Sequence, residues 1–326
     1  MVPGSARNWI AGNAGQQSNP NKNEIKKYDN STLTNSIGWS PLRLAFLLIP
    51  LAIALAGFAV SPMTRAQLPP PAPDGGYPNQ NTAEGDHALF SLTTGTDNTA
   101  IGFDALFSNT TGSENTANGV QALLHNTTGS QNTANGFEAL FSNTSGFNNT
   151  AIGQTALVSN TTGAQNTGIG IGALYRNTTG FDNTAIGVDA LLSNSTASNN
   201  TATGFDALSN NTTGTQNTAT GAIALGSNKT GSNNTATGYF ALALNTADNN
   251  TATGVDALQS NTNGHDNTAN GVGALQSNTS GHDNTANGFA ALVSNTASNS
   301  TANGAFALNS NTTGPQNTAN GFEALF

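Results

Sequence analysis

Apolar residues recur with a fixed period of 17 residues from residue 81 to residue 326. Each unit reads Asn-Thr-Ala-x-Gly-x-x-Ala-Leu-x-Ser-Asn-Thr-Thr-Gly-x-x, with an Ala at position three and an Ala-Leu pair at positions eight and nine. The apolar positions have no helical period and helix-forming residues are sparse. A unit of this length is too short for a helix pair or a propeller blade and suits one coil of a β-solenoid. The pattern therefore predicts an all-β, parallel β-solenoid of about 14 coils.

The units can be read in one register along the chain, and two of them are one residue shorter. They begin at Asn81, Asn98, Asn115, Asn132, Asn149, Asn166, Asn183, Asn200, Asn217, Asn234, Asn250, Asn267, Asn284, Ser300 and Asn317. The units at Asn234 and Asn284 lose their residue in the Asn-Thr-Thr-Gly segment. We therefore predict a turn that tolerates deletion in that segment. The array stops after Leu325 without a capping sequence, which is expected of a fragment, a truncated reading frame or an end covered by a partner.

The repeat positions have distinct expected roles. The glycine at position five predicts a corner with positive φ or a close backbone approach. The variable position four is expected outside, whereas positions three, eight and nine form a thin core. Large residues at position six are expected to add to that core (Phe103, Val120, Phe137, Ile171, Phe205, Phe289 and Phe322). The repeat positions that define the first full coils are Gly102, Ala105, Leu106, Gly119, Ala122, Leu123, Gly136, Ala139 and Leu140.

Stacking of the coils has two expected consequences. Asn would lie above Asn about 4.8 Å apart, so that side-chain amides pair along a rod roughly 65–70 Å long. One chain would bury little, because its core is mainly Ala with one Leu per coil and there is no cysteine to cross-link it. We therefore expect self-association along the rod. The alternative is disorder of the isolated chain, because biased composition and low hydrophobicity are typical of disordered segments.

The first 80 residues differ in composition from the repeats. Residues 1–43 are a polar extension, 44–66 contain the uncharged run LAFLLIPLAIALAGFAV, and 67–80 form a linker rich in Pro and Gly. The run is at the short limit for a bilayer span, and a small residue, Ala66, follows it. Segment 44–66 is therefore predicted to be a signal peptide, with a signal anchor as the alternative. Basic residues before it place the repeats outside in both cases, secreted or associated with the cell surface or outer membrane.

The repeats are acidic. After Gln67 there are 15 acidic and 2 basic side chains, a net charge of −13, so no nucleic-acid partner is expected. Acidic residues at position seven are scattered and are interpreted as a solvated face (Asp104, Glu138, Asp189, Asp206, Asp256 and Glu323).

The segment Asn-Thr-Ala-Ile-Gly-x-x-Ala, present at 98–105, 149–156 and 183–190, resembles the YadA-like head repeat of trimeric autotransporter adhesins, which also occurs in tail-fibre-like surface proteins. The resemblance implies a left-handed parallel β-roll that is trimeric, exported from a bacterial cell and used for attachment. The family's repeat is shorter, which places an insertion in the Asn-Thr-Thr-Gly corner.

Two groups of residues depart from the uniform repeat. His265-Asp266 and His282-Asp283 occupy equivalent places in consecutive units, so stacking would bring the imidazoles together, in exposed turns copied by duplication or in a metal- or pH-sensitive pair. Thr-x-Thr recurs in four consecutive units and would form a threonine ladder of the kind found on ice-binding solenoids (Thr201, Thr203, Thr218, Thr220, Thr235, Thr237, Thr251 and Thr253).

The pattern points to a surface and not to catalysis. We find no catalytic set, metal-ligand spacing or cofactor motif, and we expect no enzyme activity and no cofactor. The Asn-x-Thr triplets match glycosylation acceptors but follow from the repeat itself. We therefore predict an adhesin-like or structural surface protein that binds an unknown surface, matrix or cell ligand through many weak contacts. The alternative is an ice- or crystal-binding protein, and a third class, an enzyme on a β-helix, lacks an acidic cluster.

Overall fold

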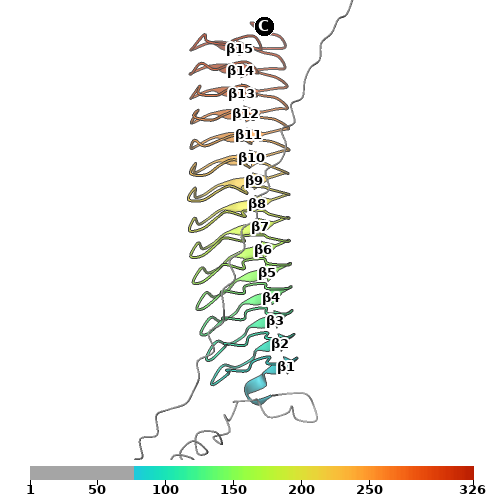
Figure 1. Ribbon diagram of the computed structural model, residues 1–326. Coiled ribbons are helices and arrows are strands. Elements are labelled where there is room, and N and C mark those ends of the chain that lie inside the picture. The colour runs from blue at the N-terminus through green and yellow to red at the C-terminus, as the bar shows by residue number, and fades with distance from the viewer. Residues whose placement is uncertain (1–76) are drawn as a thin grey trace, which may run out of the picture. The chain divides into compact units, whose positions relative to one another are not determined.

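The predicted solenoid is confirmed by a computed structural model, which describes residues 77–326. Fifteen parallel strands form a single sheet in chain order, one strand for each coil (Figure 1). A 3₁₀ turn, η1 (Pro78–Gln80), precedes the first strand, and residues 77–326 contain no α-helix. The strands are β1 (Thr82–Glu84), β2 (Thr99–Ile101), β3 (Thr116–Asn118), β4 (Thr133–Asn135), β5 (Thr150–Ile152), β6 (Thr167–Ile169), β7 (Thr184–Ile186), β8 (Thr201–Thr203), β9 (Thr218–Thr220), β10 (Thr235–Thr237), β11 (Thr251–Thr253), β12 (Thr268–Asn270), β13 (Thr285–Asn287), β14 (Thr301–Asn303) and β15 (Thr318–Asn320).

The segments 1–43 and 44–66 lie outside the described residues, as does the linker up to residue 76. The signal or anchor assigned to 44–66 therefore stays a prediction. Among residues 77–326, no helix is long and apolar enough to cross a membrane.

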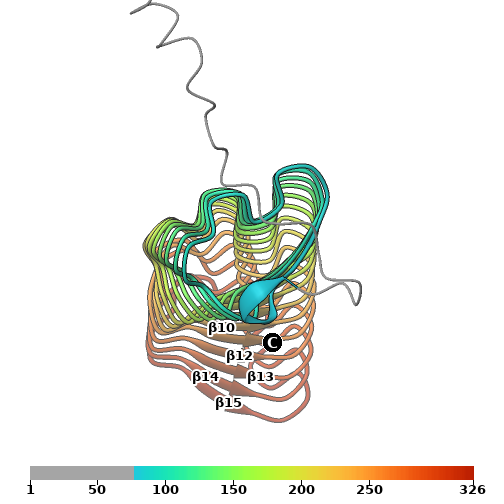
Figure 2. The same ribbon diagram turned by 90° about the horizontal axis from the view of Figure 1, so that it is seen from below.

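Each coil contains a single three-residue strand, and turns complete the circuit. Seen along the axis, equivalent turns of successive coils superpose (Figure 2). The turns depend on left-handed backbone at positions seven, nine and seventeen, for example at Asp104 (φ 56°), Leu106 (φ 51°) and Glu114 (φ 58°). Neighbouring coils are tied together outside the sheet as well, because the backbone N–H of Leu106 donates to the carbonyl of Ala122 in the next coil at 3.0 Å.

The core is as thin as the repeat predicts. Positions three, eight and nine are buried in every coil except at Ala83 in the first and at Ala324 and Leu325 in the last. In the second coil Ala100, Ala105 and Leu106 are each fully inaccessible. Within each strand the residue at position three points inward, while those at positions two and four point outward. The variable position four is therefore outside, as expected.

Two ladders of asparagine complete the interior. In the first, at position one, Nδ2 of Asn115 donates to Oδ1 of Asn98 at 3.1 Å. In the second, at position twelve, Nδ2 of Asn126 donates to Oδ1 of Asn109 at 2.8 Å. The two ladders also meet within a coil, since Asn98 and Asn109 both donate to the carbonyl of Gly112 at 2.9 Å. The expected amide pairing is confirmed, and each buried amide has its hydrogen bonds satisfied.

The shortened coils show why the second corner tolerates deletion. In the coil that begins at Asn234, the carbonyl of Ala247 accepts from Asn234 at 2.9 Å and from Asn245 at 2.8 Å, which reproduces the link that Gly carbonyls make in full-length coils. The register of the next strand is kept, with Thr235 opposite Thr251. The lost residue therefore shortens only the outer loop of the corner.

The large residues at position six do not join the core. Phe103, Phe137 and Phe205 are about half exposed, at 46%, 46% and 53%. They follow the position-five corner and stay on its outer side, because the chain does not turn inward again until position eight. The expectation that they add to the core was wrong, and buried Asn at positions one and twelve supplies the missing interior.

The invariant glycine at position five meets both expected requirements. Gly102 has φ of +132°, and a Cβ there would lie 2.5 Å from the carbonyl oxygen of Gly119 in the next coil. Its own N–H donates to the carbonyl of Glu84 in the preceding coil at 2.7 Å. A side chain would therefore both strain the backbone and separate the coils.

Candidate functional site

The most extended exposed feature of the solenoid is a column of apolar side chains at position six, which we call the outer apolar column. It runs beside the glycine corner along the coils from β2 to β15. Exposure of these side chains ranges from 39% to 70%. The column consists of Phe103, Val120, Phe137, Ile171, Val188, Phe205, Tyr239, Val255, Val272, Phe289 and Phe322. The column is interrupted at Gln154, Ala222 and Ala305, but exposed apolar side chains that recur over this length are typical of an interaction site.

The outer face of the sheet is a second regular surface. Position two is Thr in every strand, whereas position four varies in blocks of Ile, Thr and Asn. The predicted threonine rows are confirmed in β8 to β11, where Thr203 lies opposite Thr220, Thr220 opposite Thr237 and Thr237 opposite Thr253. The partner row, at position two, contains Thr201, Thr218, Thr235 and Thr251. The position-four row ends at β12, where Asn270 lies opposite Thr253, whereas the position-two row continues with Thr268.

The acidic residues at position seven are less solvated than expected. Most of them are half-buried, and they lie on left-handed backbone. Asp189 and Asp206 occupy equivalent positions in neighbouring coils, so they are not isolated. The pKa of Asp206 is raised above its usual value by burial and, to a smaller extent, by the negative charge of Asp189. The interpretation of these acids as scattered and unpaired was wrong for this pair.

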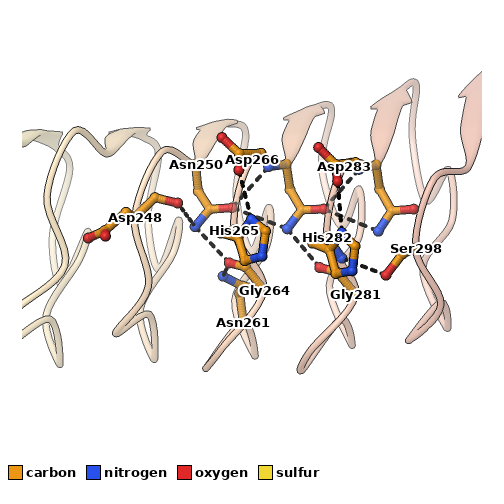
Figure 3. Close-up of polar contacts among 12 residues, drawn as sticks. Asp248, Asn250, Asn261, Gly264, His265, Asp266, Gly281, His282, Asp283 and Ser298 are labelled. Carbon is orange, nitrogen blue, oxygen red and sulfur yellow. Dashed lines mark hydrogen bonds and ion pairs between the residues drawn. The ribbon is translucent and has the colours of Figure 1, made fainter.

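The two His-Asp turns are brought together as predicted. The imidazoles of His265 and His282 stack with centroids 4.8 Å apart and planes 5° apart. Each Nδ1 contacts the following carboxylate, at 2.7 Å for Asp266 and 2.8 Å for Asp283 (Figure 3). Asp248 lies in the preceding turn of the same edge, where its carboxylate accepts from the backbone N–H of Ser232 at 2.7 Å.

The first two coils carry an aromatic cluster that the sequence pattern did not indicate. The rings of Phe90 and Phe107 stack 5.2 Å apart, and the ring of His87 lies 5.6 Å from Phe90 and 6.0 Å from Phe103. His87 Nδ1 contacts Asp104 Oδ1 at 3.1 Å. Phe90 and Phe107 occupy the same position in consecutive coils. That equivalence is the sequence signal that could have revealed the cluster.

The Asn-x-Thr triplets divide into buried and exposed groups. At position twelve the Asn that would carry the glycan is buried, and its Nδ2 donates a hydrogen bond within the ladder, as at Asn126 and Asn160. At position seventeen the acceptor is exposed, as at Asn148 and Asn199. A glycan on the first group would break the ladder, so only the second group is compatible with the fold.

No group of three or more His, Cys, Asp or Glu side chains that could hold a metal ion occurs within the part of the chain that the structure describes. Comparison of the sequence with protein-family models and with curated proteins finds no match. The resemblance to YadA-like head repeats therefore depends on the motif alone.

Proposed function

We propose that this chain is an exported structural or adhesin-like rod that acts through contacts repeated along its length and has no catalytic role. The observation that carries the proposal is the constant register of the strands, which presents the same outward positions once per coil from β1 to β15. A contact that is weak at one coil is multiplied along such an array, because each bound coil raises the effective concentration of the next.

The proposal includes export through segment 44–66 and display on the outside of a bacterial cell. It also includes the left-handed coil sense and the attachment role implied by the resemblance to adhesin head repeats. The acidic surface keeps such a rod soluble and separate from other anionic polymers.

We further propose that the rod is a homotrimer that associates through the outer apolar column. A partner must match the column at the spacing of every coil, and a second copy of the chain has that spacing by construction. The exposed parts of these side chains amount to on the order of 800 Å² per chain, about what one partner contributes to a standard interface. Self-association would add the apolar burial that the Ala-rich core lacks.

Light scattering on the purified chain tests the trimer. We expect the native particle to have three times the mass of the single chain, which is measured separately under denaturing conditions. The double variant Phe137→Lys with Phe205→Lys should be monomeric, because association would remove the lysine ammonium groups from water in the outer apolar column. Phe147→Lys with Phe181→Lys is the matched control, because those rings are equally exposed, at 46% and 48%, but lie at position sixteen. A monomeric parent chain would overturn the trimer, and equal effects of the two double variants would overturn the assigned surface.

Adhesion is tested by displaying the chain on beads and measuring detachment force from glass, a mucin layer and a collagen layer. Variants lacking two, four or six internal coils should detach at progressively lower force, because avidity depends on the number of repeated contacts. Absence of adhesion to all three surfaces, or a force independent of coil number, would contradict the proposal.

The aligned threonine rows of β8 to β11 favour ice or crystal binding as a second candidate function. The measurement is inhibition of ice recrystallisation by the purified chain. Thr220→Leu with Thr237→Leu should abolish it, whereas Thr213→Leu with Thr230→Leu, in exposed turns away from the sheet, should not. Inactivity of the parent chain would remove this candidate.

A further inference from the structure

The stacked histidines at the edge of the last third of the solenoid differ from the rest of the turn surface. His265 and His282 both occupy position sixteen, with side chains that are 49% and 41% exposed. From their geometry we propose that the pair is a binding site for a divalent transition-metal ion, with Zn²⁺ as the reference ion. Imidazole nitrogen is a preferred ligand for this class of cation.

The hydrogen bonds determine which ring nitrogen is available. A carboxylate only accepts, so Nδ1 of His265 must donate to Asp266, and Nδ1 of His282 must donate to Asp283. Each Nε2 then has its lone pair free, and neither Nε2 has a hydrogen-bond partner among residues 77–326. A ring N–H held by a carboxylate is the usual second-sphere arrangement of metal-binding histidine, because it fixes the tautomer and raises the basicity of the ligand nitrogen.

The distance between the rings is close to what a shared ion requires. Two Nε2 atoms bound to one tetrahedral Zn²⁺ lie about 3.4 Å apart, given Zn–N bonds of about 2.1 Å. The ring centroids are 4.8 Å apart and the planes are 5° apart, so the two half-exposed rings must rotate toward each other, by roughly 50° each, to direct both lone pairs at one tetrahedral ion. Water completes the coordination, because the site offers two protein ligands and the carboxylates remain on Nδ1.

Local charge favours a cation at this edge. Asp266 and Asp283 belong to the pair itself, and Asp248 lies in the preceding turn (Figure 3). Arg176 and Lys229 are the only basic residues after Gln67. The excess of carboxylates produces a negative potential that draws divalent cations toward the imidazoles, most effectively at low ionic strength.

The two other histidines of the chain provide internal controls. His125 lies edge-on against Phe141 with ring centroids 4.8 Å apart, and His87 lies in the aromatic cluster of the first coils. Neither has a second imidazole in the next coil, where Ser142 and Asp104 occupy the matching positions. They therefore present single nitrogens, which bind a divalent ion much more weakly than a pair.

Titration calorimetry tests the site, with zinc chloride added to the purified chain after removal of metal by EDTA. We expect one Zn²⁺ per chain. His265→Ser or His282→Ser should weaken binding at least tenfold, and Asp266→Asn about tenfold. His125→Ser should leave binding unchanged.

Serine occupies position sixteen in other coils, for example Ser113, Ser130 and Ser298, so the test variants are expected to keep the fold. Circular dichroism of each variant checks this directly. Binding by His265→Ser within twofold of the parent chain would overturn the proposal, as would the absence of saturable binding by the parent. Electron paramagnetic resonance with Cu²⁺ provides a separate readout, in which two coordinated nitrogens are expected in the parent and one in either variant.

Discussion

The side-chain carbonyl of Asn149 accepts two hydrogen bonds from Asn166, one from the backbone N–H at 3.0 Å and one from Nδ2 at 3.2 Å. Nδ2 of Asn149 donates in turn to Asn132 and to the carbonyl of Gly163. All of these groups are buried, so each step of the ladder transmits order from one coil to the next without water.

Replacement of Asn149 by Ala should destabilise the solenoid by roughly 3 kcal/mol, because it leaves buried donors of Asn166 unpaired. Urea unfolding followed by circular dichroism measures the change. Asn149→Ser should cost about half as much, since Ser300 already takes this position in another coil and its N–H bonds to Asn284 at 2.9 Å. Equal stability of the parent and Asn149→Ala would show that the ladder contributes nothing.

Two nearby glycines should respond differently to the same substitution. A Cβ at Gly271 (φ +140°) would lie 2.6 Å from the carbonyl carbon of Gly288, whereas a Cβ at Gly273 has no neighbour closer than 3.8 Å. Position seven, where Gly273 lies, already holds Ala290 with φ of 51°. Gly271→Ala should therefore cost roughly 3 kcal/mol or more, and Gly273→Ala about 1 kcal/mol or less, in thermal or urea unfolding. The reverse order would contradict the role of the position-five corner.

The core leucines provide a test of backbone strain at constant volume. Leu157 is fully buried with φ of 53°. Leu157→Ile should cost roughly 2–3 kcal/mol, because a β-branched side chain is disfavoured in the left-handed region, whereas Leu157→Met should cost about 1 kcal/mol. The difference between the two free energies of unfolding is the measurement, and a difference near zero would show that φ does not limit this position.

Stability should depend on pH at the Asp189–Asp206 pair. The folded-state pKa of Asp206 is raised, so its protonated form is favoured by folding. The protonated carboxyl of Asp206 makes its full contribution to the free energy of unfolding below the unfolded-state pKa. This contribution is lost as pH rises through the folded-state pKa. Asp206→Asn should therefore stabilise the chain at pH 7 by a few tenths of a kcal/mol and have no effect near pH 3.

Urea unfolding at the two pH values checks this expectation. Asp256→Asn is the control, because its neighbours at position seven are Phe240 and Gly273 and carry no charge. A stabilisation that is the same at both pH values would indicate a cause other than ionisation.

The repeat by itself determined the coil length, the parallel stacking, the corner at position five and the inward direction of Ala105 and Leu106. These features follow from period and residue size, because a short identical unit can bury its small apolar residues only against copies of itself. The sequence also indicated that His265 would lie near His282, since equal positions of consecutive units are neighbours in any stacked solenoid.

Only the tertiary structure decided which polar residues are buried and which apolar residues are not. Asn98 and Asn109 lie inside because the carbonyl of Gly112 and the neighbouring coils satisfy their amides, a condition that cannot be read from residue polarity. Phe103 lies outside because the corner at Gly102 directs it away from the axis. The direction of a side chain after a corner is a property of the folded backbone, and so are the outer apolar column and the half-burial of Asp206.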